Sequence, residues 1–415
     1  MVNNQKFINL GVSFLKILKK NKNNKIIKFN QNESYTYDDV NKFSEKLIKI
    51  FNIFKIKKKD IIAIESDKNI ISFSLVVACW KTGVAYSFFD NNDKSFRVNK
   101  ILKNLKPKKK FFFTKRINIK NSIHLNLEKL NKINICGKKK TFVKDKNLIS
   151  YIMYTSGSTG EPKGVVISHK NLSYFIEWTK KKFSIDNKSI LTNLNPLHFD
   201  NSVFDIYASF LNGACLVPFK KNELFDSKNL ILKINQLKCS IWFSVPSLLN
   251  FLMEISQKKI FSELKIKKMI FGGERFPINS IRKIKNYYKN TEFYNVSGPT
   301  ECTCICSAHK VTKKEINNLD NIPVGNLNSY FKYKILPITD KKNVGELVLI
   351  GPSISQGYHN NRSLIKQNFF VKKGNFGYKT GDIVKKVKNN FLILGRIDNQ
   401  IKFMGHRIEL EEIEN

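Results

Sequence analysis

The chain has 415 residues, of which 42% are hydrophobic, and it carries a formal net charge of +40. This length and composition are sufficient for one large or two ordinary domains with buried cores. No apolar run is long enough to cross a bilayer and no export signal is evident, which excludes a membrane-spanning helix and predicts a cytoplasmic protein. Seven cysteines without an export signal are typical of free thiols.

The positive charge raises the question of a nucleic-acid partner. Lysine is spread along the whole sequence beside many asparagine, isoleucine and phenylalanine residues, and these residue types share AT-rich codons. The charge lacks the compact basic helix and the interleaved aromatic residues of a nucleic-acid surface. We therefore attribute it to codon bias and expect no specific nucleic-acid partner and no membrane partner.

The first 150 residues alternate strand-like and helix-like segments. An amphipathic pattern that starts after a cap at Asp38 or Asp39 predicts one helix, and an apolar run that stops near Gly83 predicts another. Residues 115–148 are polar and basic and predict no clear element. The predicted strands are 25–29, 34–37, 60–65, 85–89 and 110–113, and the predicted helices end at residues 51, 80 and 105.

The rest of the chain continues this alternation and becomes rich in strands after residue 322. Strands that alternate with helices predict an α/β fold with a largely parallel sheet. Residues 199–218 predict a loop, a helix, a glycine turn and a strand. The other predicted strands are 151–154, 165–167, 239–243, 268–271 and 292–296, and the other predicted helices are 170–182, 246–253 and 278–287.

Three of the predicted strands run into glycine-bearing loops, after residues 154, 271 and 296. In open parallel sheets, ligands bind at the carboxyl ends of the strands. We therefore expect these three loops to lie at one sheet edge and to form a single site.

The first of these loops, YTSGSTGEPKGV at 154–165, is dense in glycine and hydroxyl residues. Glycine lets backbone N–H groups approach an anion, Ser and Thr add hydroxyl donors, and Lys163 adds a positive charge. The pattern predicts a loop that binds nucleotide phosphates. It is not a Walker A loop, because a glycine and a strand follow Lys163. A plain hairpin turn is the alternative.

This loop is one of eight motifs that occur in a fixed order. One such motif would be a weak signal, but eight in order are a strong one. The motifs are WKTGVAYSFFD (80–90), YTSGSTGEPKGV (154–165), FDNSVFD (199–205), FGGERFP (271–277), YNVSGPTE (294–301), GELVLIGPSISQGY (345–358), YKTGD (378–382) and GRIDNQIKFMGHRIELEEIE (395–414). In them the chain resembles the adenylate-forming superfamily of acyl-CoA synthetases, luciferases and amino-acid adenylation domains of nonribosomal peptide synthetases. It is most similar to the adenylation domains and to D-alanine–carrier protein ligases.

The resemblance implies an α/β fold with a large adenylate-forming domain of parallel-sheet layers and a small β-rich part, over residues 1–394. Residues 395–415 match the hinge, with Asp398 as its pivot, and the first strand of a C-terminal lid that is otherwise absent. Lids of this family carry a catalytic lysine, and no equivalent is present here. We therefore expect a truncated sequence, a lid supplied in trans, or a degenerate protein.

The implied activity is ATP-dependent activation of an amino acid as aminoacyl-AMP, with release of pyrophosphate. The product is then transferred to the phosphopantetheine thiol of a carrier protein. ATP and Mg²⁺ are the implied cofactors. Two alternatives stay open, namely an acyl-CoA synthetase-like ligase and a non-catalytic protein that binds a nucleotide or substrate.

The motifs also imply a nucleotide-binding set. Thr155 and Lys163 would hold the β- and γ-phosphates, Thr300 would bind the α-phosphate, and Glu301 would ligate Mg²⁺, which favours carboxylate oxygens. Asp382 would bind the ribose hydroxyls. The remaining implied nucleotide contacts are Ser156, Gly157, Ser158, Thr159, Gly160, Gly273, Glu274, Asn295, Ser297, Gly298 and Arg396. Ser297 departs from the family, which has an aromatic residue there to stack on adenine, so another side chain would take that place or ATP would bind less tightly.

The substrate class depends on Asp200. In amino-acid-activating relatives this carboxylate pairs with the α-ammonium of the substrate, and a buried carboxylate needs such a partner. The other implied pocket residues are mostly apolar, which favours a small or hydrophobic amino acid. They are Asn201, Phe204, Phe243, Ile270, Gly272, Val296, Cys304 and Ile305, with ordinary core packing as the alternative for Phe204 and Phe243.

Three cysteines, Cys302, Cys304 and Cys306, invite a metal-site interpretation. On a strand their alternate spacing would put all three thiols on one face, which is too flat for tetrahedral ligation, and no fourth ligand is evident. We therefore predict small buried strand residues. His198 precedes the FDNSVFD motif and is expected near the substrate entrance or in a structural role.

Overall fold

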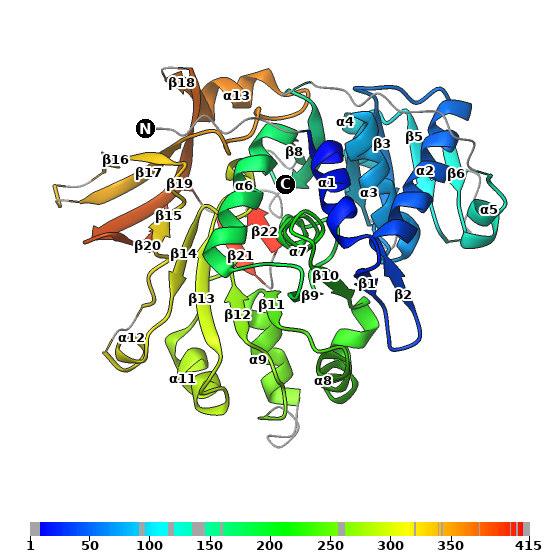
Figure 1. The fold of residues 1–415 in the computed structure, drawn as a ribbon. Coiled ribbons are helices and arrows are strands. Elements are labelled where there is room, and N and C mark those ends of the chain that lie inside the picture. The colour runs from blue at the N-terminus through cyan, green and yellow to red at the C-terminus, as the bar shows by residue number, and fades with distance from the viewer. Residues whose placement is uncertain are drawn as a thin grey trace.

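The computed structural model describes residues 9–409, except for 91–95, 115–119, 135–144, 146, 158–160, 256–261, 319–320, 339, 342, 373, 399 and 404–405. Within this part of the chain two large sheets lie beside each other, and a smaller antiparallel sheet adjoins them (Figure 1). The predicted α/β class with a β-rich part is confirmed.

The first sheet has six strands in the order β6-β5-β3-β4-β7-β8. All neighbours are parallel except β7 and β8, which form an antiparallel pair. Its central strands are buried along most of their length, as expected of a parallel sheet that is covered on both faces. The strands are β3 (Ile61–Glu65), β4 (Ala85–Phe89), β5 (Lys109–Phe112), β6 (Ser122–His124), β7 (Ile149–Thr155) and β8 (Lys163–Ser168).

The second sheet has nine strands in the order β15-β14-β13-β12-β11-β9-β10-β1-β2. The run from β13 to β1 is parallel, and antiparallel strands complete both edges. The strands are β1 (Lys25–Lys28), β2 (Ser34–Thr36), β9 (Ile190–Asn193), β10 (Cys215–Pro218), β11 (Ile241–Ser244), β12 (Lys268–Phe271), β13 (Glu292–Ser297), β14 (Ser307–Lys310) and β15 (Asn326–Leu327).

The expectation that three glycine-bearing loops share one sheet edge is wrong. The loop after β7 leaves the six-stranded sheet, whereas the loops after β12 and β13 leave the nine-stranded sheet. The loops nevertheless converge, because Ser156, Gly272 and Gly298, one from each loop, line the same cavity.

The third sheet is antiparallel, and a two-stranded sheet follows it. The third sheet has the order β16-β17-β19-β18, with β20 paired to β19. Its strands are β16 (Lys332–Pro337), β17 (Val344–Ile350), β18 (Phe369–Lys372), β19 (Asn375–Val387) and β20 (Asn390–Arg396), and the pair is β21 (Gln400–Phe403) and β22 (His406–Glu409).

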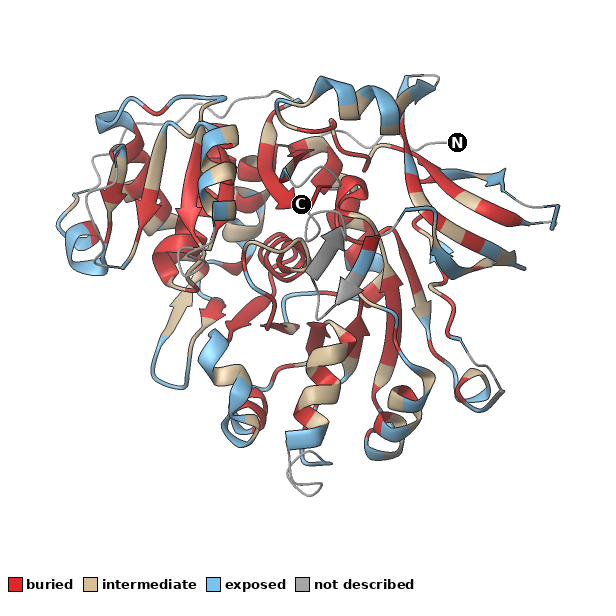
Figure 2. Ribbon diagram, turned by 180° about the vertical axis from the view of Figure 1, so that it is seen from behind, coloured by how far each residue is buried: buried red, intermediate tan, exposed pale blue. Residues whose placement is uncertain are grey.

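Two helices, α3 (Ile70–Thr82) and α7 (Asn201–Phe210), are buried on nearly all sides, whereas most others expose one face (Figure 2). Aromatic contacts between Trp80 and Tyr207 and between Phe73 and Phe210 join these two helices. The other helices are α1 (Leu10–Asn21), α2 (Tyr37–Ile53), α4 (Phe96–Leu105), α5 (Leu127–Asn131), α6 (His169–Phe183), α8 (Ser227–Gln236), α9 (Pro246–Ile255), α11 (Ile278–Tyr287), α12 (Lys313–Asn318) and α13 (Arg362–Asn368), with 3₁₀ turns η1 (Lys221–Phe225) and η2 (Thr300–Cys302).

The hydroxyl of Tyr207 on α7 is the centre of a buried hydrogen-bond cluster. It lies 2.9 Å from the hydroxyls of Tyr86 and Ser150, which belong to the six-stranded sheet, and it accepts a bond of 3.2 Å from the indole of Trp80. Because buried polar groups need partners, the cluster fixes the position of α7 against the first sheet. This matters for function because α7 begins directly beside Asp200.

The start of α2 differs from the prediction. Thr36, not Asp38 or Asp39, is the N-cap. The Thr36 hydroxyl accepts a bond from the Asp39 backbone N–H, and the Asp39 carboxylate accepts one from the Thr36 N–H, which forms a capping box. The two aspartates lie in the first turn, where negative charge interacts favourably with the helix dipole.

Among the residues that the structure describes, no helix is both long and apolar enough to span a bilayer. Segment 115–148, for which no element was predicted, contains β6 and α5 in its described part. Apart from the strand expected at residues 302–306, the predicted strands and helices are present in the described residues, with ends that differ by a few positions.

The capping box predicts that Thr36→Ala will lower the free energy of unfolding by about 1 kcal/mol, because one orphan N–H of α2 loses its acceptor. Asp38→Ala is the comparison and should lower stability less, because it removes a partly exposed ion pair with Lys42 and a charge near the helix dipole but no capping bond. Urea denaturation of both variants measures the difference. A larger effect of Asp38→Ala would show that the cap is assigned to the wrong residue.

Candidate active site

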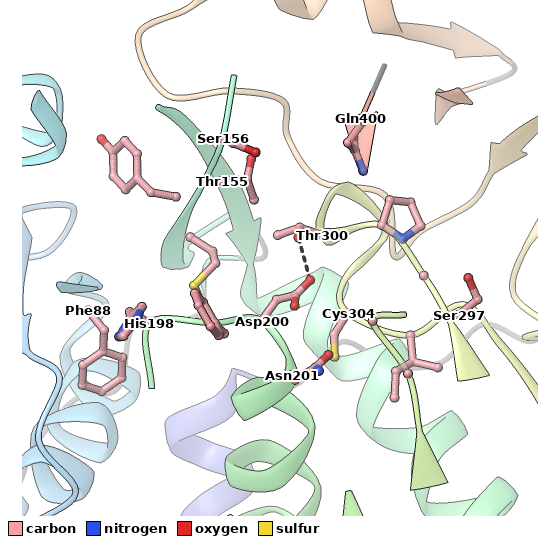
Figure 3. A pocket seen from close by; sticks show the side chains of 18 of the residues that line it. Phe88, Thr155, Ser156, His198, Asp200, Asn201, Ser297, Thr300, Cys304 and Gln400 are labelled. Carbon is pink, nitrogen blue, oxygen red and sulfur yellow. Dashed lines mark hydrogen bonds between the residues drawn. The ribbon is translucent and has the colours of Figure 1, made fainter. Parts of the chain in front are cut away.

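A cavity of about 610 Å³ lies between the carboxyl ends of strands from both large sheets (Figure 3). Its walls come from β4, β7 and α4 on the side of the first sheet, from β11, β13 and the loop after β12 on the side of the second, and from the loop that precedes α7. Asp382 of β19, Arg396 of β20 and Gln400 of β21 close one side. The predicted site residues that line it are Thr155, Ser156, Asp200, Asn201, Phe243, Gly272, Gly273, Val296, Ser297, Gly298, Thr300, Cys304, Ile305, Asp382 and Arg396.

The predicted phosphate loop joins β7 to β8, so it is also the tip of an antiparallel hairpin in which Thr155 pairs with Lys163. Thr155 and Ser156 line the cavity, and the buried Thr155 hydroxyl has no hydrogen-bond partner among the described residues. Lys163 is half-buried on β8, and neither it nor Gly157 is part of the cavity wall. Ser158, Thr159 and Gly160 lie outside the described residues.

Asp200 and Thr300 meet inside the cavity. The Thr300 hydroxyl donates a hydrogen bond of 2.6 Å to the Asp200 carboxylate (Figure 3). Asp200 stands at the start of α7, and Thr300 begins the 3₁₀ turn that follows β13. Side chains 100 positions apart in the sequence are therefore adjacent because the loop before α7 and the loop after β13 converge.

Glu301 follows Thr300 but is fully buried and does not form part of the cavity wall. Its carboxylate accepts a hydrogen bond of 2.8 Å from the Tyr358 hydroxyl, and its backbone carbonyl accepts one from Ser355. The segment that contains Ser355 and Tyr358 thus fixes both the side chain and the backbone of Glu301. That segment is the predicted motif at 345–358.

Asp382 and Arg396 face each other across β19 and β20, at 2.7 Å between the carboxylate and the guanidinium. The same guanidinium makes two further bonds, of 2.6 and 2.7 Å, to both carboxylate oxygens of Asp398. Such planar two-point contacts hold an arginine in a fixed orientation. The predicted hinge residue is therefore joined directly to the cavity wall.

Two residues predicted for the substrate pocket lie behind its wall. Phe204 and Ile270 are fully buried in the core and do not reach the cavity. The Phe204 ring packs on Phe183 and on Phe243, and Phe243 does line the cavity. Core packing, the alternative for Phe204, describes its position, whereas Phe243 belongs to the wall.

Two residues predicted to contact the nucleotide face away from the cavity. The Glu274 carboxylate accepts bonds from the backbone and hydroxyl of Ser247 at the start of α9. The Asn295 amide donates to the carbonyls of Ile322 and Pro323 and so fixes the chain beyond α12. Both side chains are occupied by structural contacts, which the motif pattern alone does not reveal.

The chain matches the family described as AMP-binding enzyme over residues 15–359. It belongs to that family. Among curated proteins, D-alanine--D-alanyl carrier protein ligases from Bacillus licheniformis and Listeria monocytogenes are each 36% identical to it over 271 residues. These matches cover 64% of this chain and 53% of each relative, so the chain spans about half the length of the curated relatives it matches.

Solved structures agree with this AMP-binding fold. The adenylation domain AlmE of Vibrio cholerae, in complex with glycyl-adenosine-5'-phosphate, superposes with a TM-score of 0.84 at 22% identity and covers 100% of this chain and 84% of its own. A fused adenylation–PCP di-domain from Klebsiella oxytoca gives a TM-score of 0.86 at 18% identity, over 99% of this chain and 83% of its own.

The prediction that three cysteines share one face of a strand is wrong for this AMP-binding enzyme. Cys302 ends a 3₁₀ turn, and the left-handed backbone of Thr303 and Cys304 (φ of 62° and 70°) reverses the chain before β14 begins. Only Cys304 lines the cavity. Left-handed backbone is costly for side-chain-bearing residues and is concentrated at functional sites. Among the described residues, no group of three or more His, Cys, Asp or Glu side chains is placed to hold a metal.

Several cavity residues were not predicted from the motifs. Most come from β4, α4 and β7 and form the side of the cavity that faces the first sheet. His198, for which a place near the entrance was one expectation, also lines this side and lies 2.9 Å from the Ser66 hydroxyl. The motif at 80–90, together with Tyr154 at the start of the motif at 154–165, was the available signal for this wall. The remaining residues are Phe88, Phe89, Asp90, Arg97, Val98, Ile101, Met153, Tyr154, Phe199, Pro299 and Gln400.

Gly298 lies in a tightly packed part of the site. A Cβ atom there would lie 2.4 Å from the Cys304 carbonyl oxygen and 2.7 Å from the Cys306 nitrogen. Because backbone cannot yield easily, we expect Gly298→Ala to lower the free energy of unfolding by about 1–3 kcal/mol.

Gly395→Ala is the control, because no atom lies within 4 Å of its added methyl group, and it should be nearly neutral. Chemical denaturation compares the two variants. Equal stability of the two variants would contradict the close approach of Gly298 to the backbone of Cys304 and Cys306.

Proposed function

We propose that this chain activates an amino acid with ATP to form aminoacyl-AMP and pyrophosphate, for transfer to the phosphopantetheine thiol of a carrier protein. The observation that carries this proposal is the Asp200 carboxylate in the cavity, hydrogen-bonded to Thr300. One side chain would bind the ammonium group of the amino acid, and the other would bind the α-phosphate. The two reacting molecules would thereby be brought into contact.

The charge of Asp200 favours an amino acid over a simple carboxylic acid. A carboxylate in a partly buried cavity is stabilised by a cationic partner, and an α-ammonium group supplies one. A fatty or aromatic acyl group would bring no positive charge to this carboxylate. The acyl-CoA synthetase alternative is therefore less consistent with the site, and the experiment below discriminates between the two.

The phosphate side of the cavity has the donors that a polyanion needs. The Thr155 hydroxyl is buried, lines the cavity and lacks a partner among the described residues, so it is available to a phosphate oxygen. Ser156 lies beside it, and Lys163 lies on the facing strand. A phosphate chain at this hairpin would satisfy the orphan hydroxyl.

The proposed reaction needs positioning more than it needs acid–base groups. A carboxylate oxygen of the amino acid forms a bond to the α-phosphorus, the bond from that phosphorus to the bridging oxygen breaks, and pyrophosphate leaves with the electron pair. Negative charge is spread over the phosphoryl oxygens, so hydrogen-bond donors that are already in place lower the barrier. The Thr300 hydroxyl would donate to the α-phosphate once the substrate ammonium has replaced it at Asp200, and Arg396 would add positive charge from the other wall.

Glu301 would be the protein ligand of Mg²⁺, for which its fully buried carboxylate would have to turn toward the cavity. Magnesium is commonly held by one or two carboxylates together with substrate phosphates, so a multi-residue cage is not required. The bond from Tyr358 occupies one oxygen of Glu301 and would orient the carboxylate. When bound, the ion would neutralise charge on the leaving pyrophosphate.

Asp382 would bind the ribose hydroxyls. Its contact with Arg396, and the contact of Arg396 with Asp398, would connect nucleotide binding to the proposed hinge at Asp398. The proposed division at residue 394 falls within β20, just before these residues. Rotation about Asp398 would break the bidentate contact with Arg396.

The side-chain pocket favours a small or apolar amino acid. Apart from the Asn201 amide, its wall is built from Phe243, Gly272, Val296, Cys304 and Ile305. The relatives named D-alanine--D-alanyl carrier protein ligases make D-alanine the first candidate and support a carrier protein as the acceptor.

ATP–pyrophosphate exchange with a panel of amino acids that includes D-alanine tests the proposal. We expect exchange with at least one small or apolar amino acid. Asp200→Asn should lower kcat/KM for it by about 10- to 100-fold, because a charge-assisted hydrogen bond is lost, and should leave the KM for ATP within about twofold.

Asp226→Asn is the matched control, because it makes the same charge change at an exposed helix cap outside the cavity. It should leave exchange unchanged. Exchange or thioester formation with simple acids and CoA, but with no amino acid, would favour the acyl-CoA alternative. ATP binding without exchange would favour a non-catalytic protein.

A further inference from the structure

The loop from residue 194 to 200 places Asp200 in the cavity wall. A fully buried carboxylate, that of Asp205, accepts a hydrogen bond from this loop. Asp205, one turn into α7, accepts two hydrogen bonds on the same oxygen. They come from the side-chain amides of Asn193, at 2.9 Å, and of Asn195, at 3.1 Å. The Asp205 carboxylate thus fixes Asn193, at the end of β9, and Asn195, near the start of this loop.

The same arrangement reaches the cavity wall. The Asn195 amide also donates a bond of 3.1 Å to the carbonyl of Phe243, and Phe243 lines the cavity. Asp205 is not itself a cavity residue. Through Asn195 it nevertheless sets the spacing between the loop that ends at Asp200 and the strand end that supplies Phe243.

A buried lysine from the first sheet completes the arrangement. Lys68 follows β3 and is 8% exposed. Its ammonium donates to the backbone carbonyls of Asn193, at 2.8 Å, and of Phe219, at 2.7 Å. These carbonyls stand at the carboxyl ends of β9 and β10, so Lys68 ties the first sheet to the point where the Asp200 loop begins.

A contribution to stability does not explain why Lys68 and Asp205 are buried at this place. Burial raises the pKa of Asp205 and lowers the pKa of Lys68, so each group is held in surroundings that disfavour its charge. The second oxygen of Asp205 makes no hydrogen bond among the described residues. Apolar side chains of similar volume often give equal or greater stability than buried charges, whereas buried polar groups can fix one arrangement of neighbouring segments.

We propose that Lys68 and Asp205 are positioning residues for amino-acid recognition. Acting through Asn193 and Asn195, they fix the Asp200 carboxylate relative to the Phe243 wall. The inference rests on the proposed function and adds to it two residues that touch neither the amino acid nor the nucleotide. Lys68 and Asp205 act on the part of the cavity that would bind the amino acid. Their loss should therefore raise the KM for the amino acid and not the KM for ATP.

The experiment measures ATP–pyrophosphate exchange for the wild-type chain and for Asp205→Ala, Asp205→Asn, Lys68→Met and the Asp205→Ala/Lys68→Met double variant. Asp205→Ala should raise the KM for the best amino acid of the panel by about tenfold, because two buried amides lose their acceptor, with the KM for ATP within about twofold. Asp205→Asn keeps a carbonyl acceptor and should restore most of the affinity. The double variant should lose less than the product of the two single losses, because both residues act through Asn193.

Ile281→Ala is the control for general destabilisation. Ile281 is a fully buried aliphatic residue of α11, so its truncation lowers stability but removes none of the hydrogen bonds that Lys68 and Asp205 make. If Asp205→Ala and Lys68→Met change both KM values as Ile281→Ala does, or change neither, the inference is overturned while the proposed function stands. If the wild-type chain exchanges with no amino acid, the proposed function fails and this inference fails with it.

Discussion

The structure depends on how the buried helix α7 is held between two sheets. Nearly all of its residues are buried, and its polar side chains make hydrogen bonds toward both sheets. Tyr207 bonds to side chains of the first sheet, whereas Asp205 bonds to the ends of strands in the second. The start of the helix is therefore fixed in three dimensions, and Asp200 stands directly before it.

This arrangement would let one cavity bind both substrates of the proposed reaction. The hairpin of β7 and β8 brings hydroxyl groups from the first sheet, and the ends of β12 and β13 bring an apolar wall from the second. Arg396 and Asp382 approach from the antiparallel sheet. A nucleotide would contact mainly the hairpin and the antiparallel sheet, and an amino acid would contact the wall near α7. Neither large sheet alone carries both sets of groups.

Much of the fold was predictable because local patterns decide local structure. Short β-branched runs gave the strands, and the apolar run that ends at Gly83 gave α3, where glycine adopts the left-handed conformation of a C-cap. The motifs identified most of the cavity residues because they mark strand ends. The assignment of β7 and β12 to separate sheets was missed, since strand partners far apart in the sequence leave no local trace.

The direction of individual side chains was the other feature that the sequence did not predict. Glu274 and Asn295 occur in the right motifs but bond to neighbouring backbone, and Phe204 and Ile270 point into the core. The cysteine segment was misjudged because alternate spacing indicates a strand only where the backbone is extended, and Thr303 and Cys304 are left-handed. Asp205 ends the motif at 199–205, but neither its role nor that of Lys68 was predictable, because their relation arises only when the two sheets meet.

The central claim is that this cavity recognises an α-ammonium group through Asp200. Calorimetric titration with glycyl-sulfamoyladenosine and with acetyl-sulfamoyladenosine tests it directly, because these stable mimics of an acyl-adenylate differ only in the ammonium group. Glycine has no side chain, so the comparison does not depend on which amino acid the pocket prefers. The account predicts that the glycyl compound binds about 10- to 100-fold more tightly. Equal affinity, or tighter binding of the acetyl compound, would contradict it.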